Sequence, residues 1–173
     1  MDKNLPKRKA MRLKNFDYSS TGAYFITICT HNRKCMLSQI VGAIHESPET
    51  VLTEYGKIVD EIIKNVSERC EVTIDRYIIM PNHVHLLVII TDSEELRAIR
   101  ESPLRGRSVI SKAIGYIKMN ASKGIHTRFG KINLWQRGFY DHIIRGKEDY
   151  EDHLKYIAEN PMRWYYDELY ADE

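Results

Sequence analysis

The hydrophobic pattern in the first half of the chain changes between strand-like and helix-like segments. Residues 23–30 are aromatic and β-branched with partial alternation, which predicts a strand. Residues 53–69 place apolar side chains at helical spacing behind Thr53, a favourable N-cap, and so predict an amphipathic helix. Residues 71–80 and 83–91 predict two further strands. The Pro-Asn dipeptide between them favours a tight turn, and therefore an antiparallel hairpin.

The second half continues with a helix, a strand and a final helix. Residues 108–123 repeat apolar side chains at helical spacing, and residues 135–145 predict a strand interrupted at Gly138. Residues 148–160 predict a helix that Pro161 ends. The order strand, helix, strand, strand, helix, strand, helix is that of a split β-α-β, or ferredoxin-like, sheet. We therefore expect an α+β fold in which an antiparallel sheet carries its helices on one face.

A short internal repeat interrupts this pattern twice. Residues 43–48 read AIHESP and residues 98–103 read AIRESP, so five of six positions are identical, and both copies fall between predicted elements. Two short copies are too few for a solenoid, which needs about three units of ~20 residues. We interpret them as loop insertions, with chance similarity as the alternative.

Composition favours a cytoplasmic globular protein. The chain has 173 residues, 43% hydrophobic and 29% charged, which is enough for one domain with a real core. We expect a basic tail over residues 1–20 and one domain over residues 21–173. The sequence shows no apolar signal core at its N-terminus and no run of ~20 apolar residues, and its cysteines form no CxxC pair. We therefore expect a cytoplasmic location and no membrane partner.

The distribution of charge is more informative than the net charge of +2. The first fourteen residues hold six basic side chains and one acidic one, and a second basic run crosses residues 97–131. Acidic residues gather over residues 46–71 and 148–173. This asymmetry fits a molecule with one phosphate-facing side, and it fits equally a basic tail with a solvated helix face.

The first candidates for chemistry are His83 and His85 in a predicted strand. Side chains alternate along a strand, so both imidazoles project from one face while Val84, Leu86 and Val88 can fill a core on the other. Two neutral imidazoles at this spacing can form half of a divalent-metal site. Ordinary core or surface histidines are the alternative. The apolar strand around them favours ligands, because packing alone rarely places two histidines there.

The last predicted helix offers the other half of a site. Tyr156 and Asn160 are four residues apart and share a helix face, with His153 on the same side. A tyrosine beside an amide that completes a metal shell can attack a phosphate that the metal polarises. The pattern by itself favours a tyrosine that packs its ring and keeps its hydroxyl in water. The chain has eleven tyrosines, so chemistry alone does not select this one.

Three ordered motifs together resemble one protein family. They are MPNHVHLLV (80–88), WQRGFYDHIIR (135–145) and YIAENP (156–161). They resemble the REP-associated tyrosine transposases, single-tyrosine members of the HUH (His-hydrophobic-His) nuclease superfamily, over the range from Tyr24 to Arg163. The resemblance implies a ferredoxin-like sheet and metal-dependent cutting and rejoining of single-stranded DNA near palindromic hairpins. The implied intermediate is a 5′-phosphotyrosine that leaves a free 3′-OH.

The resemblance also implies a role for each motif residue. His83 and His85 match the paired metal ligands, Tyr156 matches the nucleophile, and Asn160 matches the polar residue that completes a Mg²⁺ or Mn²⁺ site. Because Mg²⁺ prefers oxygen ligands, two imidazoles favour tolerance of Mn²⁺. The implied partner is single-stranded DNA with palindromic hairpins, which associates the protein with the nucleoid. A homodimer and a monomer both remain open.

Six basic residues are candidates for phosphate contacts. Those of the tail need only charge and reach to grip a hairpin stem. Those of the 135–145 block flank aromatic side chains that can stack on unpaired bases. In the alternative, the aromatic side chains belong to the core and the arginines pair with nearby acidic residues. The candidates are Lys7, Arg8, Lys9, Arg12, Arg137 and Arg145.

Three functions remain open on the sequence alone. The leading hypothesis is a DNA transposase and nickase, because a pure binder gains nothing from keeping two ligands, an amide and a nucleophile together. A domesticated protein that binds hairpin DNA without cutting it is the alternative. A metal-dependent phosphoesterase that uses water is the third, and it would tolerate Tyr156→Phe. The base that takes the phenolic proton is also open, with His142 and His153 as candidates.

Overall fold

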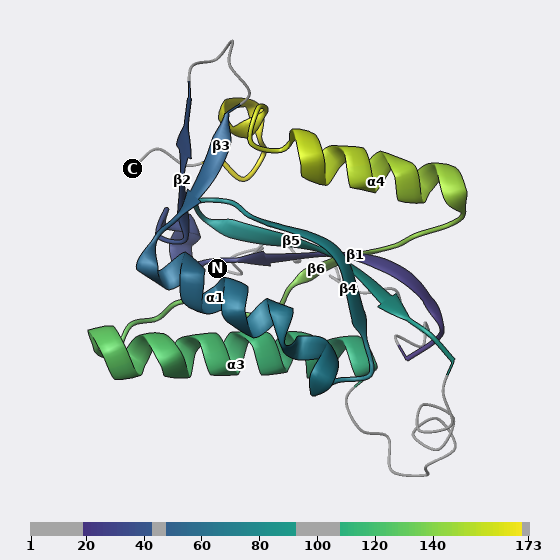
Figure 1. Ribbon diagram of the computed structural model, residues 1–173, viewed down its shortest axis with the longest axis horizontal. Coiled ribbons are helices and arrows are strands. Elements are labelled where there is room, and N and C mark those ends of the chain that lie inside the picture. The colour runs from purple at the N-terminus through teal and green to yellow at the C-terminus, as the bar shows by residue number, and fades with distance from the viewer. Residues whose placement is uncertain (1–18, 43–47, 93–107, 171–173) are drawn as a thin grey trace, which may run out of the picture.

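The computed structural model of the protein describes residues 19–42, 48–92 and 108–170 (Figure 1). Its elements form a four-stranded sheet, a two-stranded sheet, three helices and short 3-10 turns. In chain order they are β1 (Gly22–Cys29), η1 (His31–Arg33), β2 (Ser38–Val41), β3 (Glu49–Leu52), α1 (Glu54–Lys64), η2 (Val66–Glu68), β4 (Thr73–Ile79), β5 (His83–Ile90), α3 (Val109–Phe129), β6 (Tyr140–Ile143), α4 (Lys147–Glu159) and η3 (Trp164–Tyr166).

The main sheet confirms the predicted ferredoxin-like arrangement. Its strands run in the order β4-β5-β1-β6, and every neighbouring pair is antiparallel. The first strand therefore lies in the middle of the sheet, between the second strand of the β4–β5 hairpin and the last strand. Thr27 of β1 pairs with His85 on one side and with Tyr140 on the other. This register places Thr27, His85 and Tyr140 side by side on three neighbouring strands.

The main core lies between the sheet and helices α1 and α3. Alternation sends Tyr24, Ile26 and Ile28 of β1 toward these helices, together with the even-numbered residues of β5. Thr53 is the N-cap of α1, as the sequence predicts, and its Oγ1 accepts from the Gly56 N–H at 3.1 Å. Ser108 caps α3 in the same way, with Oγ accepting from the Ser111 N–H at 3.3 Å. Each fully buried Ile or Leu contributes about 1.5–3 kcal/mol through removal from water.

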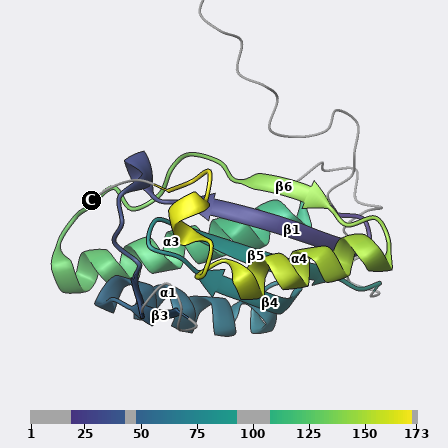
Figure 2. The same cartoon turned by 90° about the horizontal axis from the view of Figure 1, so that it is seen from above.

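The prediction that all helices share one face of the sheet is wrong for α4. Helices α1 and α3 lie side by side on one face, whereas α4 crosses the other (Figures 1 and 2). A small apolar cluster holds α4 there, formed by Phe25, Leu87 and Ile157. The physical reason is that both faces of the central strands are buried: the odd-numbered residues also need cover, and α4 supplies it.

Several local features depart from the sequence pattern. The hairpin β2–β3 was not predicted, because its strands are four residues each and carry no clear alternation. Strand β6 is shorter than the predicted 135–145, and Trp135 pairs with Thr30 in an isolated bridge instead. The repeat copies over residues 43–48 and 98–103 lie outside the described residues except for Pro48. Among the described helices, none combines the length and the hydropathy needed to cross a lipid bilayer.

Candidate active site

Strand β5 presents His83 and His85 on the face of the sheet that α4 covers. Alternation along the strand sends Val84, Leu86 and Val88 into the main core and both imidazoles the other way, as the sequence predicts. The two side chains are 0% and 2% exposed, and their ring centroids are 4.4 Å apart. Two adjacent buried imidazoles on one strand face are therefore part of the interior, and their polar atoms need partners.

His83 is held in one tautomer by its neighbour Asn82. The Nδ1 atom of His83 lies 2.8 Å from Asn82 Oδ1, and an amide oxygen can only accept, so the proton is on Nδ1. The amide orientation is fixed in turn, because Asn82 Nδ2 donates to the carbonyl oxygens of Leu169 at 2.7 Å and Arg33 at 3.3 Å. The lone pair of His83 is therefore on Nε2, the atom that faces the site. The sequence indicates Asn82 only as a turn residue.

His85 is oriented in the same way, by Thr27 of the neighbouring strand. Its Nδ1 lies 2.8 Å from Thr27 Oγ1. Burial lowers the pKa of His83 to about 3, and burial, with His83 alongside, holds the pKa of His85 well below its usual value. Both rings are therefore neutral at physiological pH, which is the form that binds a metal through Nε2. In the described part of the chain neither Nε2 has a hydrogen-bond partner, although both atoms are buried.

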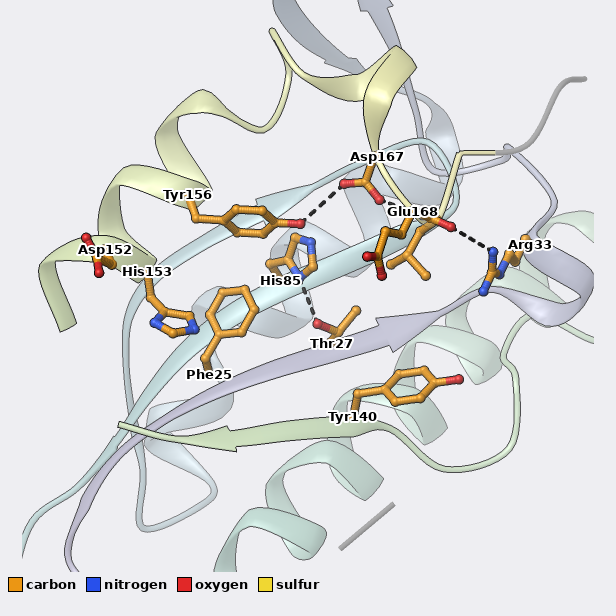
Figure 3. Close-up of a pocket in the computed structure, with 11 residues that line it drawn as sticks. Phe25, Thr27, Arg33, His85, Tyr140, Asp152, His153, Tyr156, Asp167 and Glu168 are labelled. Carbon is orange, nitrogen blue, oxygen red and sulfur yellow. Dashed lines mark hydrogen bonds between the residues drawn. The ribbon is translucent and has the colours of Figure 1, made fainter. Parts of the chain in front are cut away.

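Helix α4 brings Tyr156 and Asn160 to these histidines. The spacing along the helix puts His153, Tyr156 and Asn160 on its inner face, and the Tyr156 ring lies 5.2 Å from the ring of His85 (Figure 3). Phe25 fills the space between His85, His153 and Tyr156, with centroid distances of 4.6–5.8 Å. Asn160 is 1% exposed, and its Oδ1 is buried without a partner among the described residues. Tyr156 is 36% exposed.

Asp167 joins the site from the segment that follows η3, and no sequence pattern indicates it. Its Oδ2 accepts from the Tyr156 hydroxyl and from Asn160 Nδ2, each at 3.4 Å. Ligand atoms of His83, His85 and Asp167 all lie within 4.8 Å of one another. Burial and then the charge of Asp167 raise the pKa of Tyr156, so the hydroxyl keeps its proton at neutral pH. The hydrogen-bond partner of the Tyr156 hydroxyl is Asp167, not one of the two histidines considered as its base, His142 and His153.

His85, Tyr156 and Asp167 are among the residues that line a pocket of ≈ 560 Å³ between β1, β6, α4 and the C-terminal segment. Figure 3 shows Tyr156 and Asp167 pointing toward one another over His85, with Thr27 beneath. The carboxylates that line the pocket are Asp152, Asp167 and Glu168. The pocket combines the unpaired Nε2 of His85 with carboxylates, a set of donors suited to a divalent cation.

A second histidine cluster lies farther along α4. Ligand atoms of His142, Asp149 and His153 also fall within 4.8 Å of one another. Here, however, the facing atoms already bond to each other: His142 Nε2 lies 3.0 Å from both Asp149 oxygens, and His153 Nδ1 lies 2.7 Å from the Asp149 carbonyl oxygen. Asp149 also accepts from the Arg145 N–H at 2.7 Å, at the start of the helix. The cluster fastens α4 to β6 and leaves no buried nitrogen without a partner there.

Two aromatic side chains of residues 135–145 are buried in the core, which does not fit the hypothesis that they stack on unpaired bases. Trp135 and Phe139 are each 8% exposed and belong to the main core, whereas Tyr140 is 43% exposed. Lys118 of α3 clamps this segment: its Nζ donates to the carbonyl oxygens of Gln136 and Gly138, at 2.5 and 2.7 Å. The alternative prediction, that the aromatic side chains belong to the core, is therefore confirmed for Trp135 and Phe139.

The six candidate phosphate-binding residues have different outcomes. Arg137 and Arg145 are exposed, and within the described ranges neither forms an ion pair with Glu148 or Asp149. The four tail residues, Lys7, Arg8, Lys9 and Arg12, lie outside the described residues. Exposure leaves the two arginines accessible to a phosphate, so their role as DNA contacts stays a prediction.

Comparisons with known proteins extend over most of the chain. It is 33% identical to an uncharacterized protein of Haemophilus influenzae over 95% of this chain and 94% of the relative. It is 24% identical to the REP-associated tyrosine transposase of Escherichia coli, over 84% of this chain and 70% of the relative. A solved structure of a REP-associated tyrosine transposase bound to a REP hairpin has a TM-score of 0.61 at 21% identity, covering 88% of this chain and 73% of that one. No family model matches the chain.

Proposed function

We propose that this chain, which is similar over most of its length to REP-associated tyrosine transposases, cuts and rejoins single-stranded DNA beside palindromic hairpins. One observation carries the proposal. His83 Nε2, His85 Nε2 and Asn160 Oδ1 are buried and lack a partner among the described residues, and Asp167, which accepts from the Tyr156 hydroxyl, lies within 4.8 Å of ligand atoms of both histidines. A protein that only bound DNA would have no need of unpaired buried ligand atoms beside a tyrosine.

The donor set fits a divalent cation. Both imidazoles are neutral and held through Nδ1, so each can bind an ion through Nε2, and Asn160 adds an oxygen. The mixture of two nitrogens with oxygen suits Mn²⁺ better than Mg²⁺, which prefers oxygen alone. An ion held there would withdraw charge from a scissile phosphate and from its leaving oxygen.

In the proposed reaction Tyr156 is the nucleophile. Its phenolic oxygen bonds to phosphorus, the bond from phosphorus to the 3′ oxygen breaks, and the strand leaves with a free 3′-OH. Burial and the charge of Asp167 raise the pKa of Tyr156, so the phenol starts the reaction protonated; a base has to take its proton, and the leaving 3′ oxygen takes up a proton to become the 3′-OH. One phosphodiester replaces another, so the 3′-OH of a second strand can reverse the step without an added energy source.

The bound strand needs more contacts than the pocket provides. The exposed side chains of Arg137 and Arg145 and the basic tail supply positive charge for a hairpin stem. The relative of known structure was solved with a REP hairpin, which supports a hairpin as the partner here. A DNA substrate places the protein at the nucleoid.

A covalent-adduct assay tests the proposal. Full-length protein is incubated with labelled single-stranded hairpin DNA from palindromic repeats flanking the gene, with Mn²⁺ or with EDTA, and resolved on a denaturing gel. We expect a protein–DNA band that requires Mn²⁺ and disappears in Tyr156→Phe. The control Tyr150→Phe removes a hydroxyl of the same helix, one that donates to Asp75, and keeps the band.

Two other outcomes would contradict the proposal. Hairpin binding on a native gel without an adduct under any metal would favour a domesticated DNA-binding protein. Cleavage that persists in Tyr156→Phe would favour a phosphoesterase that uses water, because only a water nucleophile is indifferent to the phenol.

A further inference from the structure

The ligands that the sequence identifies for the cation carry no charge. Imidazole binds a metal ion as a neutral ring and Asn160 is an amide, so His83, His85 and Asn160 together leave a divalent charge uncompensated inside a buried site. Charge of that kind is costly in a protein interior unless an opposite charge lies against it. When DNA is bound, its phosphate supplies negative charge. Before DNA arrives, a carboxylate of the protein has to do so for the ion to stay.

Asp167 is the carboxylate that meets this requirement. Three carboxylates line the pocket, and only Asp167 has an oxygen within 4.8 Å of the ligand nitrogens of both histidines. Its Oδ2 also accepts from the Asn160 Nδ2 at 3.4 Å. That contact occupies the donor end of the amide and leaves Asn160 Oδ1, the unpaired atom, as the end available to an ion.

The segment that carries Asp167 is fixed to the same histidines. Asn82, which sets the His83 tautomer, donates to the Leu169 carbonyl oxygen at 2.7 Å. Arg33 donates to the Glu168 carbonyl oxygen at 3.1 Å, and Asp167 Oδ1 accepts from the Leu169 N–H at 2.6 Å. The carboxylate is therefore positioned by several bonds, and its second oxygen stays directed at the site (Figure 3).

We propose that Asp167 is a fourth ligand of the cation and gives the DNA-free protein its affinity for the ion. This inference rests on the proposed function, because it assumes that His83, His85 and Asn160 bind a divalent cation. The cluster of His142, Asp149 and His153 has similar side chains, but its facing atoms form hydrogen bonds with each other. We therefore assign the cation to the site of His83, His85 and Asp167, where the histidine Nε2 atoms are unpaired among the described residues.

The test measures Mn²⁺ binding to the full-length protein without DNA. The electron paramagnetic resonance signal of the free ion reports how much Mn²⁺ stays unbound. We expect Asp167→Asn, which keeps the shape and removes the charge, to weaken Mn²⁺ binding by about tenfold or more. Glu168→Gln is the matched control. It removes the neighbouring carboxylate of the same pocket, which lies outside the ligand cluster, and leaves affinity unchanged. His83→Ala removes a ligand and abolishes binding at this site.

A second readout separates a ligand from a group that acts on the tyrosine. In the adduct assay, Asp167→Asn should need about tenfold more Mn²⁺ for half of the maximal yield and, at saturating Mn²⁺, reach a rate within about threefold of the unchanged protein. A rate that Mn²⁺ does not restore would overturn the assignment in favour of a role on the Tyr156 hydroxyl.

The outcomes also separate this inference from the proposed function. Wild-type affinity in Asp167→Asn, with binding lost in His83→Ala, would overturn the role of Asp167 and leave the proposed metal site intact. Absence of Mn²⁺ binding in the unchanged protein, or equal binding in His83→Ala, would overturn both.

Discussion

The candidate site depends on residues that orient its functional groups as much as on the groups themselves. Imidazole has two nitrogens, and a metal needs the one whose proton is absent. Asn82 and Thr27 each bind an Nδ1, so Nε2 faces the pocket in both histidines. The motif HVH identifies the rings but says nothing about which nitrogen is turned to the site. That choice depends on a turn residue and on a neighbouring strand.

Thr27→Val tests this orienting role. Valine has nearly the same shape but forms no hydrogen bond with His85 Nδ1, so the buried ring loses the contact that orients it. We expect Mn²⁺ affinity to fall by about 10-fold to 100-fold, as for other residues that orient a metal ligand. Titration of Mn²⁺ measures it. Thr127→Val, on the exposed part of α3, serves as control, and equal affinities in the two variants would contradict the prediction.

Among the elements, helix α1 depends on one glycine for its close approach to the chain before β2. Thr53, the N-cap, bonds to the Leu37 carbonyl oxygen, so the first turn of the helix lies directly on that backbone. A Cβ on Gly56 would collide with the Leu37 carbonyl oxygen, which is backbone and has little freedom to move. Glycine is therefore needed here for space, not for an unusual backbone angle.

The pair Gly56→Ala and Gly115→Ala should have opposite effects on stability. We expect Gly56→Ala to lower the free energy of unfolding by about 1–3 kcal/mol, because α1 has to move away from its neighbour. Gly115 lies in α3 with open space around its Cα, so Gly115→Ala should raise stability by about 0.5–1 kcal/mol through helix propensity. Urea unfolding of both variants decides. A loss in Gly115→Ala, or none in Gly56→Ala, would contradict the packing seen in the structure.

Helix α3 also fixes the 135–138 segment through Lys118. This lysine donates to two carbonyl oxygens, and burial lowers its pKa. Lys118→Met keeps the apolar stem and removes both bonds, so we expect a loss of about 1–2 kcal/mol in unfolding free energy. Lys123→Met, exposed on the same helix, is the control and should change stability little. Equal stability in the two variants would show that the clamp contributes nothing.

Across the whole molecule, the two faces of the sheet have different tasks. One face buries the main apolar core under α1 and α3, and the other carries the polar site under α4 (Figures 1 and 2). The site is therefore supported by a rigid sheet whose stability comes from the opposite face. Among the described residues, Arg137 and Arg145 carry exposed basic charge beside this framework.

The basic tail should determine part of the salt dependence of hairpin binding. Each lost phosphate contact reduces the slope of log affinity against log salt by about 0.9 on a duplex stem. We expect replacement of Lys7, Arg8, Lys9 and Arg12 by alanine to lower that slope, with binding measured between low and high salt. Lys57→Ala on α1 is the control, since α1 lies on the face away from the site. An unchanged slope in the tail variant would exclude the tail from the DNA contact.

The pattern of the chain was enough for the order of the main-sheet strands and the three helices, the Thr53 N-cap, the antiparallel hairpin and the placement of both histidines on one strand face. These features follow from periodicity and from neighbours a few residues apart, which sequence records directly. The side of the sheet taken by α4, the orientation of the two histidine rings and the presence of Asp167 were decided only by tertiary structure. Each depends on contacts between segments far apart in the chain, such as Thr27 with His85 and Asn82 with Leu169, and no local pattern encodes those.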